Sequence, residues 1–227
     1  MLHVLKRFAA RLPKRWQQTL KRVHFGRQIR RHAFRTMEPE YDLLDALISP
    51  GDWVVDVGAN VGHYTVRFSR LVGDQGRVVA FEPVPETFEL LAANVAMLPA
   101  RNVTLVNAAA SDAAGLAGMT IPVSPAGLDD NYMAELGAVG AGLRVLCVTI
   151  DGLALPHAVR LVKIDAEGHE LPVLKGMAGL LRRDSPVIIV EDNSPELTVF
   201  LAGFGYADEK LPGSSNRLFR PVAPSRS

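Results

Sequence analysis

The sequence predicts an α/β fold, in which helices cover both faces of a mostly parallel, doubly wound sheet of seven strands. Short apolar runs alternate with helical segments between residues 53 and 203, which is typical of parallel strands joined by crossover helices. These runs lack polar alternation, as expected for strands that are buried on both faces. The chain has 227 residues, 48% of them hydrophobic, and can bury such a core without disulfides.

A strongly basic segment precedes the predicted domain. Residues 1–36 contain 11 Lys and Arg and no acid, whereas residues 37–227 contain the other 14 against all 24 Asp and Glu. Residues 2–25 predict an amphipathic helix, because apolar side chains recur there at helical spacing. This apolar stripe consists of Leu5, Phe8, Leu12, Trp16, Leu20 and Val23. We therefore divide the chain into a basic helical extension, 1–36, and a globular domain, 37–227.

The sequence leaves several roles open for this extension. We favour packing of the stripe on the domain or on a second subunit of a homo-oligomer, where it would cover the substrate pocket, because six exposed apolar side chains would form a large patch. A basic amphipathic helix also suits an anionic membrane surface or an acidic partner. An organelle-targeting peptide and a nucleic-acid tether are further interpretations. Nucleic acid is not favoured, because no aromatic residues for base stacking are interleaved with the charges.

Each element in the first half of the domain has a local signal. Residues 38–48 place apolar side chains on one side of a short helix, and residues 49–52 have the composition of a turn. Pro99 ends a later helix. The expected strands are 53–57, 77–82 and 103–107, and the helices between them are 61–71 and 86–98.

The second half begins with a less regular region. Residues 115–150 contain two strand-like segments, 119–123 and 143–150, around a Gly- and Ala-rich segment. We interpret this region as an insertion near the substrate, formed by a hairpin and a mobile loop. Regular alternation then returns, with strands at 160–164 and 187–190, helices at 171–181 and 195–203, and a closing hairpin of 205–210 with 217–220.

The composition excludes several classes of protein. Cys147 is the only cysteine, so the chain can form neither an intramolecular disulfide nor a multi-cysteine metal cluster. No apolar run approaches the roughly 18 residues of a membrane-spanning helix. The N-terminus lacks the apolar core of a secretory signal. We therefore expect a cytoplasmic protein, with peripheral membrane contact through residues 1–36 as the alternative.

The expected chemistry lies beyond the carboxyl ends of the strands, where doubly wound sheets bind ligands. The first strand leads into Asp56-Val57-Gly58-Ala59-Asn60-Val61-Gly62, whose glycines allow a tight turn and a close backbone approach. The helix that follows offers free N–H groups. Glu82 ends the second strand, where a carboxylate can bind both hydroxyls of a ribose. These features predict a cofactor that contains a nucleoside.

The same turn disfavours a dinucleotide. The pattern G-x-G-x-x-G is absent, and Asp56 would repel a pyrophosphate. An ammonium group would instead be attracted to this carboxylate. We therefore expect S-adenosylmethionine, which carries an ammonium group and a cationic sulfur.

Three blocks of the sequence resemble the FkbM-type methyltransferases. They are residues 54–65, VVDVGANVGHYT; residues 79–83, VAFEP; and residues 162–176, which contain VKIDAEGHE and VLKG. The K-I-D-x-E-G-x-E block is the most specific of the three. The resemblance covers about residues 51–193. It implies a Rossmann-like methyltransferase fold, S-adenosylmethionine as cofactor, and methyl transfer, usually to a hydroxyl oxygen of a sugar, polyketide or other secondary metabolite.

The candidate cofactor contacts follow the first three strands. Tyr64 and Thr65, in the first turn of a helix, would reach the methionine carboxylate. Ser111 and Asp112 follow the third strand, where such enzymes hold the adenine amino group. The full set is Asp56, Gly58, Ala59, Asn60, Gly62, Tyr64, Thr65, Glu82, Ser111 and Asp112.

The candidate catalytic residues follow the fourth strand. Asp165 would anchor the acceptor hydroxyl or take its proton, and His169 is a proton acceptor near neutral pH. Glu167 and Glu170 match the family block, which implies that one of them binds cofactor or substrate and the other is structural. We expect no metal. The alternative is an all-oxygen Mg²⁺ site of Asp165, Asp192 and Asn193, as in catechol-type methyltransferases.

The sequence therefore predicts an S-adenosylmethionine-dependent O-methyltransferase acting on a hydroxylated small molecule. One alternative is an N-methyltransferase. Another is a non-catalytic membrane- or partner-binding protein that retains the fold, although the acidic residues after four strands argue against it.

Overall fold

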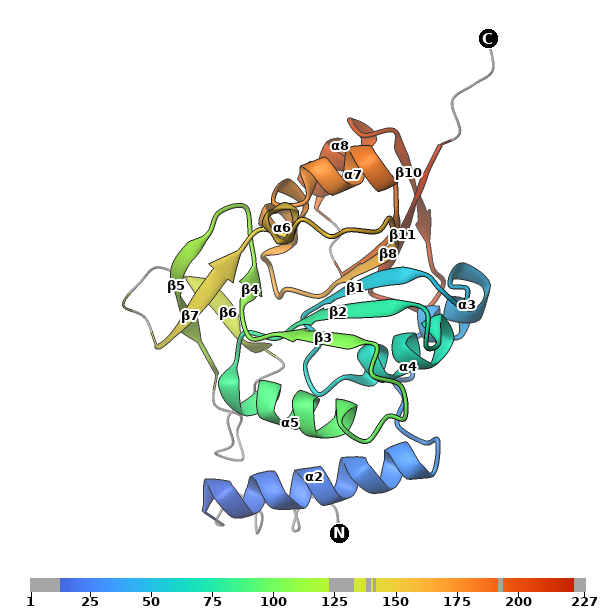
Figure 1. The fold of residues 1–227 in the computed structure, drawn as a ribbon. Coiled ribbons are helices and arrows are strands. Elements are labelled where there is room, and N and C mark those ends of the chain that lie inside the picture. The colour runs from blue at the N-terminus through green and yellow to red at the C-terminus, as the bar shows by residue number, and fades with distance from the viewer. Residues whose placement is uncertain (1–12, 123–132, 138–139, 141, 192–193, 223–227) are drawn as a thin grey trace.

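The computed structural model describes residues 13–122, 133–137, 140, 142–191 and 194–222. Its centre is a seven-stranded sheet in the order β10-β11-β9-β8-β1-β2-β3 (Figure 1). The five parallel strands are β1 (Trp53–Val57), β2 (Arg77–Phe81), β3 (Val103–Val106), β8 (Val159–Ile164) and β9 (Val187–Val190). The antiparallel pair β10 (Tyr206–Lys210) and β11 (Arg217–Pro221) closes one edge. The predicted doubly wound sheet is confirmed.

Helices cover both faces of this sheet. One face packs against α6 (Glu170–Lys175), α7 (Ala178–Asp184) and α8 (Pro195–Ala202). The other packs against α3 (Glu40–Leu47), α4 (His63–Val72) and α5 (Pro85–Val95). Neighbouring residues such as Val54 and Val55 belong to the two different core clusters, and both are fully buried. Strands buried on both faces favour apolar residues at most positions, which explains their nearly continuous apolar runs.

A smaller sheet, β4-β7-β5-β6, forms from the predicted insertion, 115–150, together with β4, which precedes it. β5 (Gly115–Thr120) pairs antiparallel with β7 (Leu143–Val148) and with β6 (Glu135–Gly137), and β4 (Ala109–Ala110) pairs with β7. β5 begins four residues before the predicted strand at 119–123. β4 and β6 are not predicted, because strands of two and three residues are too short to show a period.

The helix predicted over 171–181 is two helices, α6 and α7. Gly176 separates them. A Cβ on Gly176 would lie 1.9 Å from the carbonyl oxygen of Ser111, so the chain passes directly against the segment that follows β4. A glycine at this contact avoids a backbone collision, and the helical period alone does not reveal it.

The N-terminal helix differs from its prediction in length and in orientation. α2 (Lys14–Arg30) continues five residues beyond residue 25, and residues 1–12 lie outside the described part. Phe25 and Ile29 pack into the domain, whereas Trp16, Leu20 and Val23 are exposed. The expectation that this stripe packs on the domain is therefore wrong for its described residues. The opposite side of the helix, where Gly26 lies close to Met97, makes the contact. No described helix combines the length and apolarity needed to cross a bilayer.

His63 joins the extension to the domain, and it should make the fold sensitive to acid. Its ring stacks on Phe34 at 4.2 Å between centroids, and burial lowers the pKa of His63 to about 4. In the unfolded chain a histidine binds a proton near pH 6.5, so stability is lost as the pH falls from about 6.5 to 4, by up to about 3 kcal/mol. Urea unfolding of His63→Phe should show a smaller loss across this range. An unchanged loss would assign the acid sensitivity to other groups.

Candidate functional site

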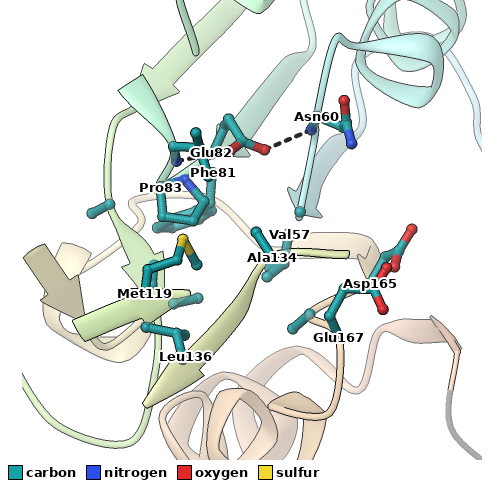
Figure 2. A pocket seen from close by; sticks show the side chains of 16 residues that line it. Val57, Asn60, Phe81, Glu82, Pro83, Met119, Ala134, Leu136, Asp165 and Glu167 are labelled. Atoms are coloured by element: carbon teal, nitrogen blue, oxygen red, sulfur yellow. Dashed lines mark hydrogen bonds between the residues drawn. The ribbon is translucent and has the colours of Figure 1, made fainter. Parts of the chain in front are cut away.

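A pocket opens beyond the carboxyl ends of β1, β2 and β8, where the strand order reverses (Figure 2). It holds about 600 Å³, including open space at its mouth. Five predicted site residues line it, namely Gly58, Asn60, Glu82, Asp165 and Glu167. The other lining residues are apolar or small: Val57, Phe81, Pro83, Val84, Ala108, Ala109, Ala110, Met119, Ala134, Leu136 and Ala166.

The turn after β1 is fixed against both neighbouring strands. Gly58 has a φ of +73°, and a Cβ built on it would lie 1.8 Å from the carbonyl oxygen of Asp165 at the end of β8. Only glycine allows this approach. On the other side, the Ala59 amide donates to the carbonyl oxygen of Phe81 at 2.8 Å. The floor of the pocket is thus built from three strand ends in direct contact.

Two backbone amides hold the Glu82 carboxylate at the end of β2. The Asn60 amide donates to Oε2 at 3.0 Å, and the Val84 amide donates to Oε1 at 2.8 Å. Burial raises the pKa of Glu82 to about 7, an effect that the two amides reduce and that Asp56 and Asp165 increase. Each carboxylate oxygen has a second lone pair. Glu82 can therefore accept two further hydrogen bonds, as a ribose diol would donate.

Two buried oxygen atoms at the β1 turn, Asp56 Oδ1 and Asn60 Oδ1, have no hydrogen-bond partner among the described residues. The other Asp56 oxygen accepts from the Thr65 hydroxyl. Burial raises the pKa of Asp56 to about 6, although Lys163 and Thr65 oppose this shift. Buried acceptors without donors are unfavourable. A ligand ammonium group would supply both the donors and the charge, so these atoms fit the amino-acid end of S-adenosylmethionine.

A buried lysine, Lys163, lies beside Asp56 and Asp165, which we call the acidic cluster. The Lys163 side chain is 2% exposed, and its Nζ lies 3.0 Å from Asp165 Oδ2 and 4.6 Å from the ring centroid of Tyr64. In the sheet Lys163 is the register partner of Asp56. Burial lowers the pKa of Lys163, but Asp165 and Asp56 outweigh burial and raise it, so the side chain is cationic. No role for Lys163 is predicted from the sequence, although a lysine within a buried apolar strand is itself an unusual signal.

The loop after β8 carries Glu167. This residue has a φ of +47°, which a non-glycine residue rarely adopts. Glu170 supports the loop, because its Oε1 accepts from the amides of Ala166 at 3.0 Å and Gly168 at 3.2 Å. Glu170 therefore shapes the loop, and Glu167 is left to line the pocket.

The charged residues of the pocket wall are all acidic. Glu82 lies on one side, and Asp165 and Glu167 lie across from it (Figure 2). Burial, with the negative charges of Asp165 and Glu191 nearby, raises the pKa of Glu167 to about 7. Such a wall attracts a cationic ligand and repels a phosphate.

Of the predicted residues, Asp56, Ala59, Gly62, Ser111, Asp112 and His169 do not line the pocket. His169 Nε2 is 2.9 Å from the Ser111 hydroxyl oxygen, and burial lowers the pKa of His169. Ser111 is buried and Asp112 is exposed. Residues 108–110 line the pocket in their place. The structure therefore brings Asp165 and Glu167 together at the pocket and sets His169 beside it.

Tyr64 and Thr65 also lie outside the lining, because their hydroxyls are committed to acidic side chains. The Tyr64 hydroxyl is 2.7 Å from Glu38 and 3.1 Å from Glu40. Burial and these carboxyl groups raise the pKa of Tyr64 above its usual value. Thr65 donates to Asp56 and so orients that carboxylate.

The apolar wall of the pocket has almost no sequence signal. Met119, Ala134 and Leu136 reach it from the small sheet and from the chain just before β6, and Pro83 and Val84 reach it from the end of β2. The sequence places the 115–150 region near the substrate but does not identify these residues. Single apolar side chains in an irregular segment have no pattern that would mark them.

The alternative magnesium site stays a prediction. Asp192 and Asn193 lie outside the described residues. Within the described ranges, no group of three His, Cys, Asp or Glu residues is placed to hold a metal ion.

Comparisons with known proteins show the family of the chain and support its fold. The model of the methyltransferase FkbM domain matches residues 56–212. Hexuronic acid methyltransferase AglP of Haloferax volcanii is 29% identical over 161 residues, which cover 68% of this chain and 63% of that relative. The chain thus spans less than two thirds of the length of this relative.

Two solved structures share the fold. The methyltransferase FkbM from Methylobacillus flagellatus KT has a TM-score of 0.54 at 16% identity, covering 80% of this chain and 50% of that one. A putative rRNA methylase from Clostridium thermocellum has a TM-score of 0.51 at 13% identity, covering 81% and 94%. At these identities the likeness supports the fold alone.

Proposed function

The chain belongs to the FkbM methyltransferase family, and from this premise we propose that it transfers a methyl group from S-adenosylmethionine to a hydroxyl oxygen of a sugar-type small molecule. The observation that carries the proposal is the carboxylate-lined pocket, in which two amides hold Glu82 at the end of β2. The family membership supports methyl transfer. The pocket supports the cofactor.

The pocket suits S-adenosylmethionine at three points. Glu82 would accept the two ribose hydroxyls. The unpartnered oxygen of Asn60 in the pocket wall, and that of Asp56 in the adjoining strand β1, would accept from the ammonium group. The apolar wall with Val84 and Met119 would contact the adenine ring. A dinucleotide would place its pyrophosphate against the same carboxylates, which is electrostatically unfavourable.

When bound, the cofactor supplies a methyl group that is already activated by the sulfonium charge. The protein would then align the acceptor oxygen with that methyl group and exclude water. Glu167 would accept the proton that the acceptor hydroxyl loses, since a pKa of about 7 suits a base at neutral pH. Asp165 is paired with Lys163 and would orient the hydroxyl by accepting a hydrogen bond from it.

A sugar-type acceptor is proposed because AglP is named a hexuronic acid methyltransferase. The test is transfer of a labelled methyl group from S-adenosylmethionine to a panel of sugars, uronic acids and matched amino sugars. We expect labelled methyl ethers that form only when a free hydroxyl group is present. Labelling confined to amines would support the N-methyltransferase alternative, and binding of NAD in place of S-adenosylmethionine would contradict the proposal.

Replacing Glu82 by Ala should weaken binding of S-adenosylhomocysteine by about 1–3 kcal/mol, the cost of leaving hydrogen-bonding groups unmet in a buried site. The ionised carboxylate is the better acceptor, so the wild-type affinity should rise with pH through about 7 and level off above it. Calorimetry at several pH values, within about one unit on either side of this pKa, measures both effects. Glu82→Ala should lose most of the pH dependence. If it keeps the wild-type affinity, Glu82 does not bind the ribose.

A further inference from the structure

We propose that the outward face of α2 docks the protein on an anionic lipid surface. This outer face is defined by Trp16, Leu20, Val23 and Arg27, which follow one another at helical spacing along one ridge. The three apolar members are 55%, 51% and 44% exposed. An exposed ridge of large apolar side chains on a surface helix marks an interaction site more often than chance.

The opposite face of α2 fixes this orientation. Phe25 and Ile29 are packed in a core cluster with Leu90 of α5. At the surface, Arg22 of α2 forms an ion pair with Glu89 of α5 at 3.1 Å. Figure 1 shows α2 lying along α5 at the outer edge of the domain. The outer face cannot turn inward without breaking these contacts, so it is held toward solvent.

Charge complementarity identifies the partner. α2 contains six Lys and Arg and no acid. Arg15, Lys21, Arg27 and Arg30 make no ion pair with any described residue. Anionic lipid headgroups would neutralise these cations while Trp16 and Leu20 enter the interface.

Two other partners fit the helix less well. A second copy of α2 would bring like charges together. A nucleic acid would neutralise the cations but would leave the apolar ridge without a partner, because phosphate recognition uses no apolar contact. Of these three partners, only a lipid interface uses both properties of the outer face.

The lipid surface would lie on the pocket side of the domain. Lys14, at the start of α2, is 3.9 Å from Glu86, and Gln18 donates to the Glu86 carbonyl oxygen. Glu86 is two residues beyond Val84, which lines the pocket. The amino-terminal end of α2 and the pocket therefore share one end of the domain.

The test is sedimentation of the full chain with vesicles of phosphatidylcholine, alone or mixed with phosphatidylglycerol, at low and high salt. We expect binding that needs phosphatidylglycerol and falls with salt. Leu20→Glu should reduce the partition coefficient about tenfold or more, because it removes an apolar contact and adds a like charge to the lipid. Val199→Glu is the matched control, since Val199 is 72% exposed on α8, and it should bind as the wild type does.

Tryptophan fluorescence tests whether Trp16 of the outer face contacts the lipid. The chain has two tryptophans, so in a Trp53→Phe background the emission reports Trp16, and it should shift to the blue on phosphatidylglycerol vesicles. Absence of sedimentation at low salt would overturn the proposal. So would equal binding by Leu20→Glu, self-association that Leu20→Glu abolishes without any vesicle binding, or binding to duplex DNA in preference to vesicles. All of these readouts are independent of methyl transfer.

Discussion

Replacing Glu167 by Gln is expected to lower the turnover of methyl transfer by about 10²–10⁴, the contribution that a positioned general base makes. Gln has the same shape but cannot accept the proton of the acceptor hydroxyl. Glu167 is a pocket carboxyl group whose pKa, raised by burial and by Asp165 and Glu191, lies at about 7, and unlike Glu82 it is not held by backbone amides at the proposed ribose position. Asp165 is less suited as base because it is paired with Lys163. Single-turnover rates with saturating cofactor measure the step directly.

The pH dependence of the methyl-transfer rate tests the same role of Glu167. The carboxylate form of Glu167 is the proton acceptor, so the wild-type rate should rise as the pH increases through about 7 and then level off. The Glu167→Gln variant should lack this rise. Because Glu82 titrates in the same range, the rates must be compared at saturating cofactor, where the affinity no longer contributes.

His169→Ala is the matched control. His169 is bonded to Ser111 outside the pocket lining, so its loss should leave the rate within about tenfold of the wild type, well short of the effect of a general base. Should His169→Ala cause the larger loss, His169 is the base and Glu167 only binds. Preserved S-adenosylhomocysteine affinity in both variants is required for either conclusion.

Much of the fold and part of the site follow from local sequence. The buried strands are predictable because both of their faces are apolar, and Glu82 is predictable because it ends such a strand. Gly58 is also predictable, since a turn from strand to helix at a ligand needs a residue without a side chain. The roles of these residues can be predicted from the local sequence, without knowledge of their contacts with distant segments.

The remaining features depend on contacts between distant segments. Met119 and Leu136 line the pocket only because the small sheet folds over it. His169 follows the fourth strand closely, yet the loop held by Glu170 turns it toward Ser111. The face of α2 that packs is chosen by Phe25 and Ile29 against α5, although the apolar stripe on its other side shows the clearer helical period. Periodicity finds an amphipathic face but does not tell which partner is available.

Replacing Lys163 by Met should destabilise the domain by about 3–5 kcal/mol at neutral pH, the usual effect of removing one partner from a buried charge pair. Met keeps the length of the side chain but leaves Asp56 and Asp165 without their cation. The free energy of unfolding, measured in urea, reports this loss. S-adenosylmethionine should recover part of it, because its cationic groups would enter the same acidic cluster.

The dependence of this loss on pH separates charge from packing. Burial already raises the pKa of Asp56 to about 6, and without Lys163 it should rise further. Below that pKa Asp56 is neutral and no longer needs a cation, so the need for Lys163 disappears. The difference in stability between wild type and Lys163→Met should therefore shrink as the pH falls through a window of roughly three units, from about 8 to about 5, that contains the pKa of Asp56. The double variant Lys163→Met with Asp56→Asn should be more stable at pH 8 than Lys163→Met alone. A loss of equal size at both pH values, with no recovery in the double variant, would mean that Lys163 contributes through packing and that the acidic cluster does not depend on its charge.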